Sequence, residues 1–187
     1  MNKVWTLLVM VLGATPAMAD ICEDHWFTRN LIIDRAGYCF GSTLGKAVFD
    51  NSDCISKQVS LTPEAARQVA EIRAEEQRLQ CKIDTSARTL DLEDMRIRRK
   101  LSDLPIRDEF ESGCIGWQAG VTALYAGWDQ TTTVVGRIQD GDDVLYSHAY
   151  REGWAYVTVR APGWGALKSA GWLGRETSEK SCRQWAG

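Results

Sequence analysis

Apolar and polar side chains repeat with the period of a helix in the first half of the chain and with that of a strand near its end. Residues 62–81 show the helical repeat most clearly, with one apolar face formed by Ala65, Val69, Ile72 and Leu79. Thr62 suits a helix N-cap, and Pro63 suits the first helical position. The pattern therefore predicts a helix that begins at this pair and ends at Cys81.

Further helical segments are predicted on both sides of this one. An earlier helix ends at Gly37, which can adopt a positive φ, and a short helix covers residues 43–49. After Cys81, residues 88–113 form a connector, in which apolar spacing predicts a helix over about 91–101. The basic run at 96–100 fits the last turn of that helix better than it fits a site for an acidic polymer.

Residues 114–187 differ, because short runs of β-branched and aromatic side chains alternate there with Gly-containing turns. The pattern predicts strands at 134–138, 144–150, 154–159 and 171–173. Short strands with Gly-containing turns at this spacing suggest a small closed barrel. The expected fold class is α+β, with an N-terminal all-α module held by disulfides and a C-terminal small β-barrel.

The first nineteen residues have the features of a secretory signal peptide. Lys3 precedes an apolar run at 4–13, and residues 17–19 (Ala-Met-Ala) form a small-x-small cleavage site. No later stretch reaches the length of about 20 apolar residues that a membrane-spanning helix needs. We expect a periplasmic or secreted protein that begins at Asp20 after cleavage and has no membrane span.

Charge and cysteine content narrow the class of protein further. The formal net charge is −3, and the chain lacks the broad basic face that nucleic-acid binding uses. All six cysteines follow the signal peptide, and an even number in an exported chain favours disulfides over a metal site. Sequence permits many pairings, but the distribution of the cysteines favours pairing within each part, as Cys22–Cys81, Cys39–Cys54 and Cys114–Cys182. The sequence shows no catalytic constellation, metal-ligand set or cofactor motif.

The helical part carries the motif W-x-x-R-N-x-I-x-x-R-x-G-Y-C-F at residues 26–40. Its characteristic positions are Trp26, Arg29, Asn30, Arg35, Gly37 and Tyr38. Over residues 21–82 the chain resembles the YARHG domain, in the exported, uncharacterised form that carries four cysteines. Ala36 stands where that family has its histidine, so the resemblance implies a fold and an extracellular location but no activity.

The strand-rich part resembles a bacterial SH3-type domain over residues 118–176. The resemblance lies in the order of the motifs V-V-G-R-I, D-G-D-D-V, G-W-A-Y-V and G-W-L. Domains of this type commonly bind peptides, so the resemblance implies a groove lined by Tyr125, Trp128, Trp154 and Trp164. The competing interpretation places Trp154 and Trp172 in the barrel core.

These observations predict a signal peptide at 1–19, a helical module at 20–87, a connector at 88–113 and a barrel at 114–187. The expected function is that of a non-enzymatic envelope protein that binds a peptidoglycan peptide or another envelope protein through the barrel, without a cofactor. Two alternatives stay open: an enzyme acting on envelope polymers, with the helical module as its catalytic part, and a secreted protein inhibitor. His25 is expected in a surface or helix-capping role and His148 at an exposed strand position, and the oligomeric state stays open.

Overall fold

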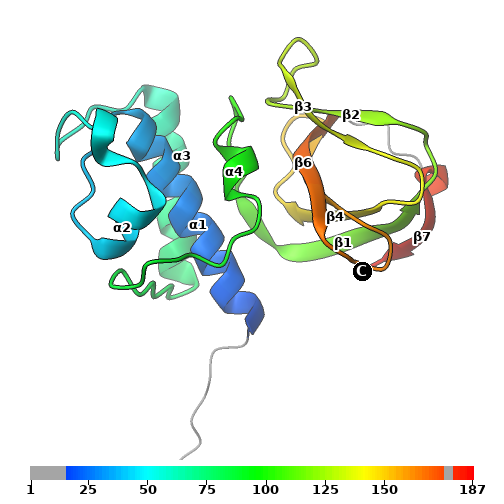
Figure 1. Ribbon diagram of the computed structural model, residues 1–187, viewed down its shortest axis with the longest axis horizontal. Coiled ribbons are helices and arrows are strands. Elements are labelled where there is room, and N and C mark those ends of the chain that lie inside the picture. Colours follow the sequence, from blue (N-terminus) through cyan, green and yellow to red (C-terminus); the bar gives the residue numbers. More distant parts are fainter. Residues whose placement is uncertain (1–15, 175–178) are drawn as a thin grey trace, which may run out of the picture.

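The computed structural model describes residues 16–174 and 179–187, which form a helical part and a strand-rich part in contact with each other (Figure 1). The predicted signal peptide falls mainly on residues 1–15, outside the described residues. No helix within the described ranges is long and apolar enough to cross a membrane.

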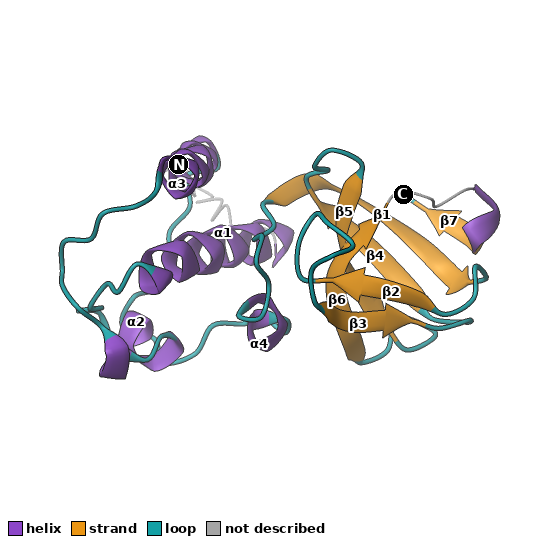
Figure 2. Ribbon diagram, turned by 90° about the horizontal axis from the view of Figure 1, so that it is seen from above, coloured by secondary structure: helices purple, strands orange, loops and turns teal. Residues whose placement is uncertain are grey.

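The helical part is built around one long helix. Its elements are α1 (Pro16–Arg35), α2 (Thr43–Val48), the 3-10 turn η1 (Asn51–Asp53), α3 (Pro63–Arg78) and α4 (Met95–Arg98). α3 packs along α1, and both Figure 1 and Figure 2 show α4 between the other helices and the sheet. The predicted helices at 43–49 and 62–81 are confirmed, with ends that differ by a few residues.

Two local features predicted from the sequence are present, the N-cap of α3 and the glycine turn after α1. Thr62 Oγ1 accepts a hydrogen bond from the amide of Ala65 at 3.2 Å and so caps α3. Gly37 turns the chain after α1 with a φ of +85°. A Cβ at position 37 would also lie 2.7 Å from Cδ1 of Ile55, so this turn requires glycine for its backbone angle and for space.

The helix predicted over 91–101 is wrong in length, since only the single turn α4 is helical. The apolar residues that suggested this helix include Leu101 and Leu104. Both are buried, but they belong to an extended segment that lies between the two parts. Because the helical part and the sheet cover this segment from two sides, its apolar residues do not need to share one helical face. Their spacing therefore predicted a helix where the chain is extended.

All seven strands belong to one antiparallel sheet in the order β3-β2-β6-β5-β4-β1-β7. Their bounds are β1 (Arg107–Trp117), β2 (Thr122–Tyr125), β3 (Val134–Ile138), β4 (Asp143–His148), β5 (Trp154–Arg160), β6 (Leu167–Gly174) and β7 (Cys182–Ala186), with the turn η2 (Glu179–Ser181) before the last. The sheet curves strongly in Figure 1, but no pairing between the described residues joins the edge strands β3 and β7. The sheet is therefore not closed.

The predicted SH3-like barrel is accordingly not confirmed. The strands expected at 134–138, 144–150 and 154–159 are present as β3, β4 and β5. However, β1 begins at Arg107, inside the predicted connector, and pairs with both β4 and β7. Its first half is largely charged and exposed, so its sequence lacks the alternation that reveals a half-buried strand.

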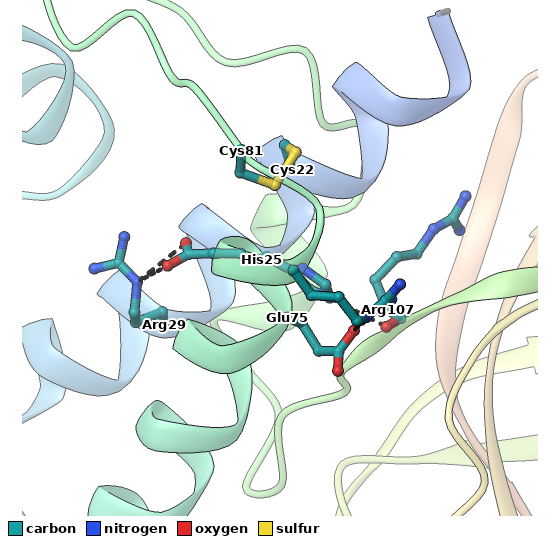
Figure 3. Close-up of a disulfide and its surroundings, with 8 residues drawn as sticks. Cys22, His25, Arg29, Glu75, Cys81 and Arg107 are labelled. Carbon is teal, nitrogen blue, oxygen red and sulfur yellow. Dashed lines mark hydrogen bonds and ion pairs between the residues drawn. A yellow bond between two sulfur atoms is a disulfide. The ribbon is translucent and has the colours of Figure 1, made fainter.

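The three predicted disulfides are confirmed. Cys22–Cys81 links α1 to the residues after α3 (Figure 3), Cys39–Cys54 closes the loop that contains α2, and Cys114–Cys182 links β1 to the edge strand β7. Each part of the chain is thus cross-linked within itself, as expected in an oxidising compartment.

One apolar core continues from the helices into the sheet. Phe27 and Ile72 from α1 and α3 belong to the same buried cluster as Tyr156 and Trp172 from β5 and β6. Trp172 is fully buried, as the core interpretation predicts, and its indole Nε1 donates to the carbonyl oxygen of Asp103 at 2.7 Å. The helical part and the sheet therefore stabilise each other through shared burial.

Candidate functional site

A buried ion cluster joins α1 and α4 to the sheet. At its centre lies Arg98, whose side chain is 1% exposed. Its Nη1 donates to Asp24 Oδ1 at 2.7 Å and to Thr28 Oγ1 at 3.0 Å, and its Nε donates to Asp94 Oδ2 at 2.8 Å. Asp24 and Thr28 are four residues apart on α1, and so are Asp94 and Arg98 at α4, so each helix presents its pair on one face.

Two strands complete the cluster from the sheet side. The hydroxyl of Tyr156 on β5 donates to Asp94 Oδ2 at 2.7 Å. On β4, Nε2 of His148 lies 2.9 Å from Nη2 of Arg98 and 3.2 Å from Oδ2 of Asp24. These contacts fix the helical part on the sheet through charge-assisted hydrogen bonds in addition to apolar packing.

Burial and mutual charge set the protonation of this cluster. Burial would raise the pKa of Asp24, but the Arg98 guanidinium and His148 hold that pKa well below its usual range. Burial would lower the pKa of Arg98, yet Asp24 and Asp94 raise it well above its usual value. Burial lowers the pKa of His148 and raises that of Tyr156, so both side chains are neutral at pH 7. The cluster thus holds two carboxylates against one guanidinium.

A cleft of about 650 Å³ adjoins the cluster, between α1, the segment before α4, and strands β1, β4 and β5. This volume lies in the range of small-molecule and cofactor sites. Its acidic lining consists of Asp20, Glu23, Asp24, Asp91, Glu93, Asp94 and Glu111, and its guanidinium groups belong to Arg98, Arg107 and Arg160. Carboxylates therefore outnumber guanidinium groups in the cleft by more than two to one.

Ion pairs at the rim neutralise part of this charge. Arg107 pairs with Asp20 at 3.2 Å and also with Glu111, and Arg160 pairs with Glu93. Burial raises the pKa of Asp20, and Arg107 opposes that effect. These pairs leave the cleft with an excess of negative charge.

Three buried polar atoms of the cleft have no hydrogen-bond partner among the described residues: Asp94 Oδ1, Arg107 Nε and Thr158 Oγ1. One is a carboxylate acceptor, one is a cationic donor, and one is a hydroxyl that can do either. A buried polar group without a partner costs about 1–3 kcal/mol, so natural structures contain few of them. The cleft is therefore lined by residues whose buried polar atoms do not use their full hydrogen-bonding capacity within the described part of the chain.

A serine, a histidine and an aspartate also meet beside this cleft. Ser147 Oγ lies 3.3 Å from Nδ1 of His148, whose Nε2 faces Asp24. Nε2 of His148 also lies 2.9 Å from Nη2 of Arg98, and its two neighbours favour opposite tautomers: Arg98 favours an unprotonated Nε2, and Asp24 favours a protonated one. Ser147 is only 1% exposed, so its hydroxyl is closed to a large substrate.

Both histidines are buried, so the expected exposed position of His148 is wrong, and His25 does not lie at the surface. His148 is 5% exposed in the ion cluster, and His25 is 1% exposed with Nε2 3.1 Å from the carbonyl oxygen of Arg107 (Figure 3). The sequence holds a usable signal for part of the cluster, because Asp24 and Thr28 stand on a face of α1 beside the apolar residues Ile21 and Leu31. Polar residues at core positions indicate a buried network.

The four aromatic residues of the predicted groove do not all lie at one place, because Trp164 is apart from the other three. The Tyr125 and Trp154 rings meet edge to face at 5.8 Å, and the Trp128 ring meets that of Trp172 at 5.6 Å. Trp164 lies in the loop after β5, at the opposite end of that strand from Trp154, and packs over Gly113 on β1. None of the four lines the cleft. Their role in ligand binding stays a prediction.

The motif residues of the helical part hold its segments together. Arg29 pairs with Glu76 on α3 at 2.9 Å (Figure 3), and Asn30 Nδ2 donates to the carbonyl oxygen of Trp26 at 2.7 Å. Arg35 donates to the carbonyl oxygen of Leu101 at 2.7 Å and so attaches α1 to the connector. Tyr38 forms a bridge with the chain beyond the second disulfide. These contacts are structural.

Comparison with known protein families finds a match for each part of the chain. Residues 4–77 match the YARHG domain, which confirms that resemblance, and no match to an SH3-type family is found for the second part. A search of the curated proteins and a search of the solved structures found no match. Residues 80–187 match a domain of unknown function, DUF4453. Because this second match covers more than half of the sequence, the chain belongs to the DUF4453 family.

Proposed function

We propose that this protein is an exported binding protein and that its ligand, a short charged peptide of the cell envelope, occupies the cleft between the helical part and the sheet. The observation that carries the proposal is the presence of three unpartnered polar atoms, Asp94 Oδ1, Arg107 Nε and Thr158 Oγ1, in one cleft. A peptide supplies hydrogen-bond donors, hydrogen-bond acceptors and charge, so it can provide a partner for each of these three atoms. The disulfides and the YARHG domain fit a periplasmic or extracellular location.

The rigidity of the cleft supports the same proposal. Its floor is cross-linked by Arg98, which binds residues from two helices and the sheet, so the cleft needs little ordering when a ligand enters. A preformed site loses less conformational entropy on binding. The apolar side chains Leu92, Leu145 and Leu167 provide contact area beside the polar groups.

The proposal is tested by NMR titration with soluble peptides released from peptidoglycan. The backbone amides of Leu145 and Thr158 should shift on titration, and Leu145→Trp, which fills the cleft, should weaken binding at least about tenfold. Val121→Trp is the matched control, because Val121 is exposed and lies outside the cleft. Shifts confined to the indole groups of Trp128 and Trp154 would move the site to the predicted aromatic surface and overturn the cleft assignment.

One observation favours a second candidate, an enzyme acting on envelope polymers. Ser147, His148 and Asp24 lie in a line beside the cleft, as in a hydrolase triad. The burial of Ser147 weighs against this candidate, because a polymer cannot reach its hydroxyl. If release of soluble fragments from labelled cell wall is found, and Ser147→Ala abolishes it in a folded protein, this candidate replaces the first.

A further inference from the structure

We infer that the cleft selects ligands by a primary ammonium group and that Asp94 is the residue that binds it. This inference rests on the proposed function, because it names the chemistry of the ligand at the same site. It predicts that a peptide with a free side-chain amine binds and that its acetylated counterpart does not.

The charge of the buried cluster gives the first argument. Asp24 and Asp94 face a single guanidinium, that of Arg98, while the His148 ring and the Tyr156 hydroxyl are neutral. The cluster therefore carries an excess of one negative charge in a position almost closed to water. Buried charges are normally paired, so this excess negative charge favours the binding of a cation.

The geometry of Asp94 identifies where that cation binds. Its Oδ2 already accepts from Arg98 Nε at 2.8 Å and from the Tyr156 hydroxyl at 2.7 Å. Its Oδ1 has no partner, although the residue is 97% buried and lines the cleft. The open acceptor of this carboxylate is therefore its Oδ1 alone.

A single open oxygen favours an ammonium over other cations. A guanidinium binds a carboxylate best through two parallel hydrogen bonds, and Oδ2 of Asp94 is already occupied. A divalent metal ion needs several ligand oxygens, and the described residues contain no cluster of His, Cys, Asp and Glu that could hold one. An ammonium is compact and has three donors, so it can use Oδ1 and also the Thr158 hydroxyl.

Arg107 defines a second feature of the ligand. Its Nη2 is engaged by Asp20 and Glu111, but its Nε is buried without an acceptor in the same cleft. A carbonyl or carboxylate oxygen of the ligand would accept from this Nε. The ligand class is therefore a peptide that carries a free amine together with peptide carbonyl groups.

The test is isothermal titration calorimetry of the full-length, disulfide-bonded protein with two peptides. One is Ala-Glu-Lys-Ala with a free lysine amine and an acetylated N-terminus, and the other differs only by acetylation of the lysine. Loss of one charge-assisted hydrogen bond should weaken binding roughly tenfold to a hundredfold. Equal affinities would overturn the ammonium inference while the cleft remained a peptide site, whereas no binding of either peptide, or of peptidoglycan peptides, would overturn both proposals.

Three variants test whether the loss of affinity on acetylation of the lysine arises in the cleft. Asp94→Asn removes the charge, so the two peptides should bind it with similar, low affinity. Thr158→Val removes a hydroxyl that has no partner in the free protein, so it should leave folding intact and still weaken the free-amine peptide several-fold. Glu64→Gln on the exposed start of α3 is the control and should change neither affinity. Selectivity unchanged in Thr158→Val and Asp94→Asn would overturn the assignment.

Discussion

Arg98 is the residue on which the junction between the two parts depends. It is almost completely buried, and its guanidinium contacts Asp24, Thr28, Asp94 and His148. Replacing a buried ion pair by apolar groups on both sides can be neutral, but removing one partner leaves the other charge buried and unpaired. The same side chain therefore supports the fold and keeps the cleft in shape.

Arg98→Met should accordingly destabilise the protein by about 3–5 kcal/mol, because the carboxylates of Asp24 and Asp94 lose their cation. The measurement is the free energy of unfolding from urea denaturation followed by circular dichroism. Arg96→Met is the matched control on the same helical turn, since Arg96 is exposed, and it should cost less than about 0.5 kcal/mol. Similar values for both variants would contradict the central role of Arg98.

Stability should also depend on pH through His148 and Asp24. The pKa of His148 is lower in the folded protein than in the unfolded chain, so its contribution is full above about pH 6.5 and is lost as the pH falls below that value. The pKa of Asp24 is likewise lowered, so its contribution is present above its unfolded value near 3.8 and is lost at lower pH. The unfolding free energy should fall between pH 7 and 5, and a His148→Gln variant should show a smaller fall. An identical pH profile in that variant would contradict the assignment.

At the scale of elements, the sequence predicts those segments that carry a cap, a turn residue or a run of β-branched and aromatic side chains. The caps and apolar face of α3, the turn at Gly37, and strands β3 to β5 follow from local propensity and simple periodicity. α4 and β1 do not, because Leu101 and Leu104 are buried between two layers and because the charged start of β1 is exposed. The cleft could not be predicted from the sequence, because its residues come from segments that meet only in the folded chain.

The edge strand β7 offers a prediction at this scale. Cys114–Cys182 links it to β1 across 68 residues, and β1 is its only neighbour in the sheet among the described residues. Replacing both cysteines by serine should destabilise the protein by about 2–5 kcal/mol. It should also speed hydrogen exchange of the amides in Cys182–Ala186 more than of those in β5. Uniform exchange rates across the sheet would contradict a local role for this bond.

At the scale of the whole molecule, the continuous core and the ion cluster should make the two parts unfold together. Phe27 and Ile72 share a core with Tyr156 and Trp172, and Arg98 crosses the same boundary. Urea denaturation should therefore give one transition, with coincident midpoints for the far-ultraviolet circular dichroism of the helices and for tryptophan fluorescence. Two separate midpoints would show that the parts are independent domains.

Binding of a ligand ammonium by Asp94 can be seen in a crystal structure of the complex with the free-amine peptide. The lysine nitrogen should lie about 2.7–2.9 Å from Asp94 Oδ1, with a peptide carbonyl accepting from Arg107 Nε. A peptide bound elsewhere, for example along Tyr125 and Trp154, or bound in the cleft with its amine in solvent, would contradict it.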